Sequence, residues 1–331
     1  MSERNQLAER ILNIENHTFE DIALEVFYFQ YHNNRVYQQF CNLLGINPGK
    51  INASNQIPFL PIGLFKSHII ITNSWKPQIV FQSSGTTGSQ TSRHYVRDLD
   101  FYGAISLKGF QTAYSKITDY CFLALLPSYL EREGSSLVYM VNHFMNVSGQ
   151  PANGFYLDDL EALAQHLEKQ QKSGFKTILL GVTFALLDFA ATFKLTFPEL
   201  IIMETGGMKG RRKEITRFEV HEALVENFAV SSIHSEYGMT ELMSQAYSSG
   251  NGIFSPSPTM KVVPRDPMDP LSKTTFSRAC CLNIIDLGNL DTCSFIATDD
   301  LGKVFVDGTF EVTGRLDKSD IRGCNLLLAG L

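Results

Sequence analysis

The sequence has a single tryptophan, no long run of basic residues and no long apolar run. Lys and Arg number 28 against 34 Asp and Glu, so the formal net charge is −6. No stretch is basic enough to neutralise a line of phosphates, which disfavours nucleic acid or an anionic membrane as a partner and favours a small molecule. Residues 1–19 carry scattered charges without a central apolar segment. We therefore expect no signal peptide, no membrane insertion and a cytoplasmic location.

Several short motifs of known chemistry are also absent. There is no Walker A loop, no G-x-G-x-x-G segment and no G-x-S-x-G elbow, and the lack of an elbow argues against a serine hydrolase. The cysteines form no C-x-x-C pair, and none has a histidine at metal-ligand spacing. We expect reduced thiols and no structural zinc at the six cysteines, which are Cys41, Cys121, Cys280, Cys281, Cys293 and Cys324.

The composition is that of a folded enzyme. Hydrophobic residues make up 44% of the 331 residues and charged residues 19%, so the chain is long enough to bury a sizeable core. The 24 Phe and 12 Tyr residues supply aromatic area for a core or for an apolar substrate pocket, and composition does not separate these uses.

The pattern of apolar residues predicts an α/β fold after an N-terminal helical layer. Apolar residues at helical spacing fill Thr18–Leu44, and aspartates can cap helices over 98–116 and 158–171, with a further helix over 211–227. Short apolar runs ended by polar or glycine-rich residues predict buried strands. These strands are Gln78–Phe81, Tyr120–Leu126, Lys176–Gly181, Leu200–Glu204 and Val230–His234.

From Gly250 onward the composition changes: Pro and Gly become frequent, and the apolar residues lie in short segments that alternate with polar ones. Ala279–Ile285, Thr292–Ala297 and Lys303–Val306 indicate an antiparallel, barrel-like subdomain. We therefore divide the chain into a helical layer over 1–75, an α/β core that binds nucleotide and acyl group over 76–249, and a β-rich part over 250–331.

One segment carries a strong signal for phosphate binding. An apolar strand leads into Ser83, Ser84, Gly85, Thr86, Thr87 and Gly88. Glycines let the backbone approach an anion, and hydroxyls donate further hydrogen bonds to its oxygens. Arg93 and His94 follow closely and could steer the β- and γ-phosphates of a nucleotide. The alternative is an ordinary Ser/Gly surface loop.

A second segment, His234–Glu241, follows the strand predicted at Val230–His234 and ends in an acid. Tyr237 could stack on a purine, Thr240 could bond an α-phosphate, and Glu241 could hold Mg²⁺. Without other evidence, Tyr237 is as well explained as a core residue and Thr240-Glu241 as the start of a helix.

Two further segments lie near the end of the chain. The carboxylate of Asp300 in Thr298–Gly302 suits a pair of ribose hydroxyls, and the forked guanidinium of Arg315 in Gly314–Asp317 suits a phosphate or hydroxyl. Each segment taken alone reads as a β-turn.

In this order, the segments resemble the core motifs of the adenylate-forming superfamily, from about Phe81 to Arg322. Residues 83–88 match its phosphate loop, and Tyr237–Glu241 matches its Tyr-Gly-x-Thr-Glu motif, with Gly238 as the glycine. Gly206 and Gly207 fall in its adenine-side segment. Asp300 matches its ribose-binding residue, Arg315 its nucleotide-contacting residue and Asp317 its hinge residue. The resemblance implies the large N-terminal domain of that fold, with two packed α/β subdomains, a small barrel-like subdomain, and ATP and Mg²⁺ as cofactors.

The chain differs from the superfamily pattern in two places. The usual lysine after the loop is missing, with Arg93 the nearest basic residue, and the sequence stops at Leu331, so we expect the mobile C-terminal domain to be absent. The shorter pattern is similar to the acyl-protein synthetases (LuxE family). That resemblance implies a carboxylic acid, such as a long-chain fatty acid, activated as acyl-AMP. It also implies that Cys324 carries the acyl group toward an acyl-accepting reductase or carrier protein.

Two alternatives remain at this point. An acyl- or aryl-CoA ligase would pass the acyl group to coenzyme A, and a non-catalytic nucleotide- or acyl-binding protein would need a partner for turnover. A carboxylate is already ionised at neutral pH, so adenylation needs positioning and charge neutralisation rather than a general base.

Overall fold

The computed structural model describes residues 2–83, 91–127, 134–157, 159–206, 216–269 and 275–316. Its helices are α1 Glu3–Leu12, α2 Phe19–Asn33, α3 Arg35–Leu43, α4 Leu64–Ser67, α5 Leu99–Tyr114, α6 Ser136–Ser148, α7 Leu160–Ser173, α8 Thr183–Thr192 and α9 Arg217–Phe228. Its strands are β1 Leu60–Pro61, β2 Ile79–Gln82, β3 Arg93–Val96, β4 Cys121–Leu125, β5 Gly154–Tyr156, β6 Thr177–Val182, β7 Ile201–Thr205, β8 His234–Tyr237, β9 Ala246–Ser248, β10 Ile253–Pro256, β11 Met260–Arg265, β12 Cys280–Asp286, β13 Phe295–Val304 and β14 Phe310–Arg315.

Capping side chains place several helix starts where the sequence predicts them. Asp98 accepts from the backbone N–H of Phe101 at the start of α5, and Asp159 caps α7 in the same way. The apolar stretch over Thr18–Leu44 forms two helices, α2 and α3. Asn34 interrupts it because its extended backbone ends α2 and its side chain caps α3.

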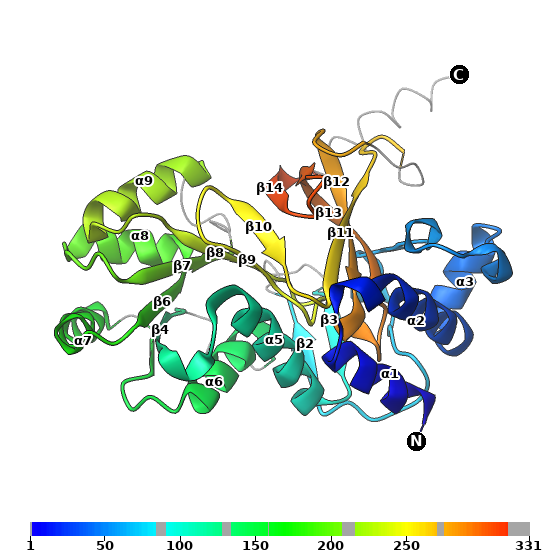
Figure 1. The fold of residues 1–331 in the computed structure, drawn as a ribbon, viewed down its shortest axis with the longest axis horizontal. Helices are drawn as coiled ribbons and strands as arrows, with labels where there is room; N and C mark the ends of the chain where they lie inside the picture. The colour runs from blue at the N-terminus through cyan, green and yellow to red at the C-terminus, as the bar shows by residue number, and fades with distance from the viewer. Residues whose placement is uncertain are drawn as a thin grey trace.

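The first half of the sheet is parallel and buried on both faces. Strands β5, β4, β6, β7 and β8 lie side by side in that order. Helices α7, α8 and α9 lie on one face, and α5 and α6 lie on the other (Figure 1). Every residue of β4 and β6 is buried, as expected for strands covered on both sides.

The second half is antiparallel and continuous with the first. The order continues from β8 through β9, β10, β14, β13 and β12 to β11, so the described residues form one twelve-stranded sheet, with β1 paired to β13. Helices α1, α2 and α3 lie beside this half (Figure 1). The prediction of an α/β fold with an antiparallel part is confirmed, whereas the boundaries at residues 75 and 250 stay predictions.

Three strand predictions are wrong in detail. The strand predicted at Val230–His234 begins only at His234, because its pairing with β7 starts at Met203 and His234. The strands predicted at Thr292–Ala297 and Lys303–Val306 are one strand, β13, which runs through the Asp299-Asp300 pair without a turn. Pairing of β13 with β14 over residues 300–304 holds this stretch extended.

Within the described residues, no helix combines the length and the apolarity that crossing a membrane would require.

Candidate functional site

The candidate residues gather where the parallel half of the sheet meets the antiparallel half. Strands β7 and β8 end side by side, with Thr205 paired to Glu236. The backbone then continues into Gly206 after β7 and into Gly238 after β8. The carboxyl ends of parallel strands are where open α/β sheets bind their ligands.

Three predicted residues are hydrogen-bonded to one another in this region. The Tyr237 hydroxyl donates to Oδ2 of Asp300 at 2.8 Å, and Nε of Arg315 donates to Oδ1 at 3.0 Å. The register between β13 and β14 places Asp300 directly opposite Arg315. Residues that are 63 and 15 positions apart in the chain thus share one carboxylate.

The three groups differ in exposure and therefore in what they can do. Tyr237 and Asp300 are buried, while the Arg315 side chain is 65% exposed, so its guanidinium is accessible to an anionic ligand. Burial and the Asp300 carboxylate raise the pKa of Tyr237, which keeps its hydroxyl a donor. Burial works against the charge of Arg315, but the carboxylates of Asp300 and Asp299 outweigh it and raise its pKa.

Glu241 is a buried carboxyl beside these groups. Burial raises the pKa of Glu241, although a hydrogen bond from Ser92 and the nearby cations Arg315 and Lys66 favour its charged form. No cluster of three or more His, Cys, Asp or Glu able to hold a metal occurs among the described residues. A single carboxylate still suits Mg²⁺, which binds through one or two carboxylates together with the phosphates of a substrate.

Ser83, the first residue of the predicted phosphate loop, follows a hairpin that contacts this site. Strands β2 and β3 pair antiparallel, with Gln82 opposite Arg93. Beyond them, the Ser83 hydroxyl accepts from the Ser92 N–H at 2.9 Å, and the Ser83 N–H donates to the Ser92 carbonyl at 3.1 Å. Since Ser92 also bonds Glu241, the base of the loop lies against the Tyr237–Glu241 segment.

The predicted phosphate contact of His94 is wrong. Residues of β3 alternate in burial, with Arg93 and Tyr95 partly exposed and His94 and Val96 buried. The His94 ring is fully buried and bonds the Thr240 carbonyl through Nδ1, so it faces the interior. The two-residue period of a strand explains why neighbouring basic residues point to opposite sides.

Gly206 follows β7 in a left-handed conformation, with φ at +73° and open space where a Cβ would lie. The Thr183 hydroxyl lies 2.7 Å from its carbonyl and 2.9 Å from Oε2 of Glu204. Burial alone would raise the pKa of Glu204, but His221 and Arg217, each 3.5 Å from its carboxylate, bring it below its ordinary value.

Other predicted residues lie outside the described residues. These are Ser84, Gly85, Thr86, Thr87, Gly88, Gly207, Asp317 and Cys324.

The structure adds two residues that the sequence does not indicate. Glu236 is buried on β8 and accepts from the Thr205 hydroxyl at 2.5 Å. Asn289 is buried in the turn after β12 and donates to the Glu241 carbonyl at 2.8 Å. The sequence did not mark Glu236, because it lies beyond the strand predicted at Val230–His234, and Asn289 depends on a contact between distant segments.

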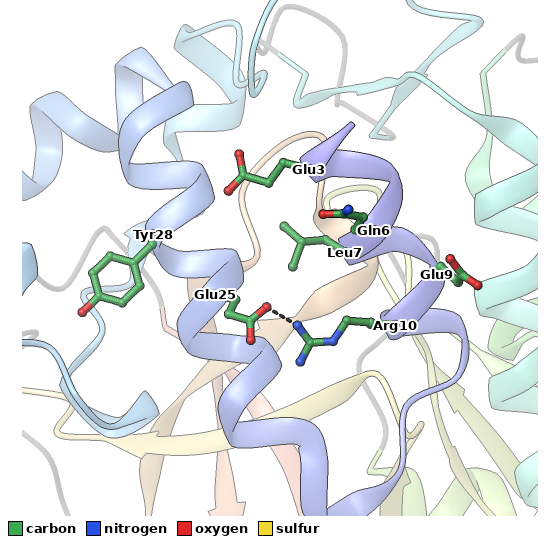
Figure 2. Close-up of a pocket in the computed structure, with 7 residues that line it drawn as sticks. All are labelled: Glu3, Gln6, Leu7, Glu9, Arg10, Glu25 and Tyr28. Atoms are coloured by element: carbon green, nitrogen blue, oxygen red, sulfur yellow. Dashed lines mark hydrogen bonds and ion pairs between the residues drawn. The ribbon is translucent and has the colours of Figure 1, made fainter. Parts of the chain in front are cut away.

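A cavity of about 560 Å³ lies elsewhere, between α1 and α2. Figure 2 shows its lining, in which Arg10 and Glu25 form an ion pair. Three acids and one arginine line it, and none of the predicted site residues does. The lining residues are Glu3, Gln6, Leu7, Glu9, Arg10, Glu25 and Tyr28.

Comparison with known proteins identifies the fold. No family model matches the sequence, and no curated protein matches it. Solved structures do match. A 2-hydroxyisobutyryl-CoA ligase in complex with 2-HIB-AMP and CoA aligns with a TM-score of 0.66 and 12% identity over 96% of this chain and 70% of its own. The chain has the fold of the large N-terminal domain of adenylate-forming enzymes.

Two further structures share this fold. ATP-bound MatB from Rhodopseudomonas palustris aligns with a TM-score of 0.55 and 13% identity over 73% of this chain. A long-chain-fatty-acid-CoA ligase from Archaeoglobus fulgidus aligns with a TM-score of 0.52 and 13% identity over 74%. The alignments span only 49% and 52% of those two proteins, so the chain matches about half of their length.

Proposed function

We propose that the chain activates a carboxylic acid with ATP, forming acyl-AMP and releasing pyrophosphate. The observation that carries this proposal is the hydrogen-bonded set of Tyr237, Asp300 and Arg315. It lies at the carboxyl ends of β7 and β8, in a fold whose solved examples include an ATP-bound enzyme and one bound to an acyl-AMP.

Each part of ATP has a candidate partner. Asp300 would accept from the ribose hydroxyls, and the exposed Arg315 would contact a phosphate or hydroxyl nearby. Tyr237 and Gly206 would border the adenine together with Gly207 and Gly238. Ser83 and the loop that follows it, through Gly88, would take the β- and γ-phosphates with help from Arg93.

Glu241 would hold Mg²⁺, which neutralises phosphate charge when bound. The buried carboxyl suits this use, because a divalent cation compensates a charge that burial otherwise disfavours. The substrate carboxylate would attack the α-phosphorus in line, with Thr240 donating to the α-phosphate. The new P–O bond replaces the bond to the leaving pyrophosphate.

An ATP–pyrophosphate exchange assay tests the proposal. Purified chain, ATP and Mg²⁺ are incubated with labelled pyrophosphate and a series of carboxylic acids that includes long-chain fatty acids. Label in ATP that depends on one acid supports adenylation. Binding of ATP by calorimetry, without exchange for any acid, points to the nucleotide-binding alternative or to a missing partner.

For the second step we propose transfer of the acyl group to a thiol. There are two candidate acceptors. Cys324 would attack the acyl carbon as thiolate, release AMP and hold the acyl group as a thioester for a reductase or carrier protein. Coenzyme A is the second candidate, favoured by the CoA bound in the 2-hydroxyisobutyryl-CoA ligase structures.

Intact-mass analysis separates the two acceptors. An acyl adduct that disappears in Cys324→Ser, with exchange activity unchanged, supports the protein thioester. Turnover that requires coenzyme A and survives Cys324→Ser supports the ligase.

A further inference from the structure

The backbone of the Thr240-Glu241 pair is held by two buried side chains from distant segments. Nδ1 of His94, on β3, lies 2.7 Å from the Thr240 carbonyl. Nδ2 of Asn289, in the turn Leu287–Asn289 after β12, donates to the Glu241 carbonyl at 2.8 Å. Both side chains are almost wholly buried, at 0% and 1% exposure, so a ligand cannot reach them.

The bonds around His94 define its tautomer. Burial lowers the pKa of His94 to about 4, so the ring is neutral at neutral pH and carries one N–H. A carbonyl can only accept, so the network assigns this proton to Nδ1, facing Thr240. Nε2 then accepts from the Thr292 hydroxyl at 3.0 Å. The ring is thereby fixed from both sides.

The turn Leu287–Asn289 and the residues that follow it are hydrogen-bonded to the N-terminal helices. Gln30 of α2 donates to the Asn289 carbonyl at 2.9 Å, and Arg4 of α1 bonds Asp291. At the other end of the turn, Asp286 accepts from the backbone N–H groups of Met243 and Ser244. The segment after β8 is therefore hydrogen-bonded to distant parts of the fold at residues 240, 241, 243 and 244.

We propose that His94 and Asn289 are positioning residues, which orient Thr240 and Glu241 toward ATP by fixing two consecutive peptide carbonyls. This inference rests on the proposed function of the site. Fixing successive peptide planes fixes the direction in which the two side chains leave the backbone. A group displaced by about 1 Å can lose about 100-fold in rate, so an undamaged fold with a displaced Thr240-Glu241 pair is a poor catalyst.

The test compares two substitutions of equal size at one position. His94→Asn keeps an N–H donor where Nδ1 lies, whereas His94→Leu removes it. Asn289→Ala removes the second bond. Asn153→Ala is the matched control, because Asn153 also bonds backbone groups, at Phe122 and Met145, but lies at the opposite, amino end of β4.

For each variant, exchange kinetics give kcat and KM for ATP and for the acid, and thermal unfolding gives Tm. We expect His94→Leu and Asn289→Ala to lower kcat/KM for ATP by about 10- to 100-fold, because a misplaced catalytic pair costs that much. His94→Asn should recover most of the loss. Asn153→Ala should lose comparable Tm and keep its kinetic constants within about twofold.

Two results would overturn the inference alone. In one, His94→Leu loses Tm as Asn153→Ala does but retains its kcat/KM for ATP. In the other, His94→Asn is as impaired as His94→Leu, which would make the donor irrelevant. A wild-type chain that neither binds ATP nor supports exchange would instead refute the proposed function, and the positioning roles with it.

Discussion

Replacing Glu236 with glutamine should make the stability of the protein less dependent on pH. The Glu236 side chain is buried, next to the Thr205 hydroxyl and the Glu204 carboxylate. Burial, with a smaller contribution from Glu204, raises the pKa of Glu236 to about 7, against an ordinary value of 4.5, while the hydrogen bond from Thr205 opposes the rise. The folded protein therefore keeps a proton that the unfolded chain releases.

The sign and size of the effect follow from this difference. Below about pH 4.5 Glu236 is protonated in both the folded and the unfolded protein, so its ionisation does not lower the free energy of unfolding. Between about 4.5 and 7 only the folded state holds the proton, so the free energy of unfolding falls as pH rises. At 1.36 kcal/mol per pKa unit, the full loss above pH 7 is about 3 kcal/mol.

Urea unfolding of the wild type and of Glu236→Gln at several values between about pH 4.5 and 8 measures this effect. Subtracting the two plots of unfolding free energy against pH removes the contribution that every other titrating group makes to the pH dependence. Glu236→Gln should gain about 3 kcal/mol relative to the wild type across this range. Glu222→Gln, an exposed carboxyl on α9, controls for the change in net charge. A difference that stays flat, or that moves the other way, would show that Glu236 is ionised in the folded protein and would refute the reasoning.

Three other substitutions test separate contacts. Asp300→Asn keeps an acceptor but removes the charge facing Arg315, so calorimetry should show about tenfold weaker ATP binding, and unchanged affinity would contradict the ribose role. Arg4→Leu leaves the Asp291 carboxylate buried with less compensation, so the free energy of unfolding should fall by about 3 kcal/mol in urea, and a neutral result would refute a stabilising role. Glu241→Gln should raise the Mg²⁺ concentration for half-maximal exchange by about tenfold or more, and an unaltered Mg²⁺ titration would exclude Glu241 as the ligand.

Local signals in the sequence predicted much of the fold. Asp98 and Asp159 cap the helices that they were expected to cap, because a cap depends only on neighbouring residues. The apolar runs at β4, β6 and β7 are strands for a similarly local reason, since a strand covered on both faces needs an uninterrupted apolar segment.

Long-range pairing decided what the sequence did not predict. Two aspartates and a glycine over 299–302 are typical of a turn, yet pairing with β14 makes them the middle of a strand. Val230 and Ile233 are residue types that favour strands, but the residues that pair with β7 begin at His234. In both places the partner strand, which lies far along the chain, overrides the local preference.

The same holds for the site: the order of the motifs predicted some of its residues, and the others depend on contacts between distant segments. The order of the motifs predicted that Tyr237, Asp300 and Arg315 belong together, and they share one carboxylate. His94 was misassigned because it was judged by its distance from the loop along the chain, whereas the alternation of β3 turns it inward. Asn289 carries no local signal, since its role depends on a turn that only the folded chain brings to Glu241.

Following the oxygen atoms of the acid tests the central claim most directly. The wild-type chain is incubated with ATP, Mg²⁺ and carboxylic acids labelled with ¹⁸O in the carboxyl group, hydroxylamine traps the activated acyl group, and mass spectrometry analyses the nucleotide products. Attack of the carboxylate on the α-phosphorus predicts AMP that carries one ¹⁸O for each acyl group transferred. Unlabelled AMP, or ADP with the label in inorganic phosphate, would contradict the account.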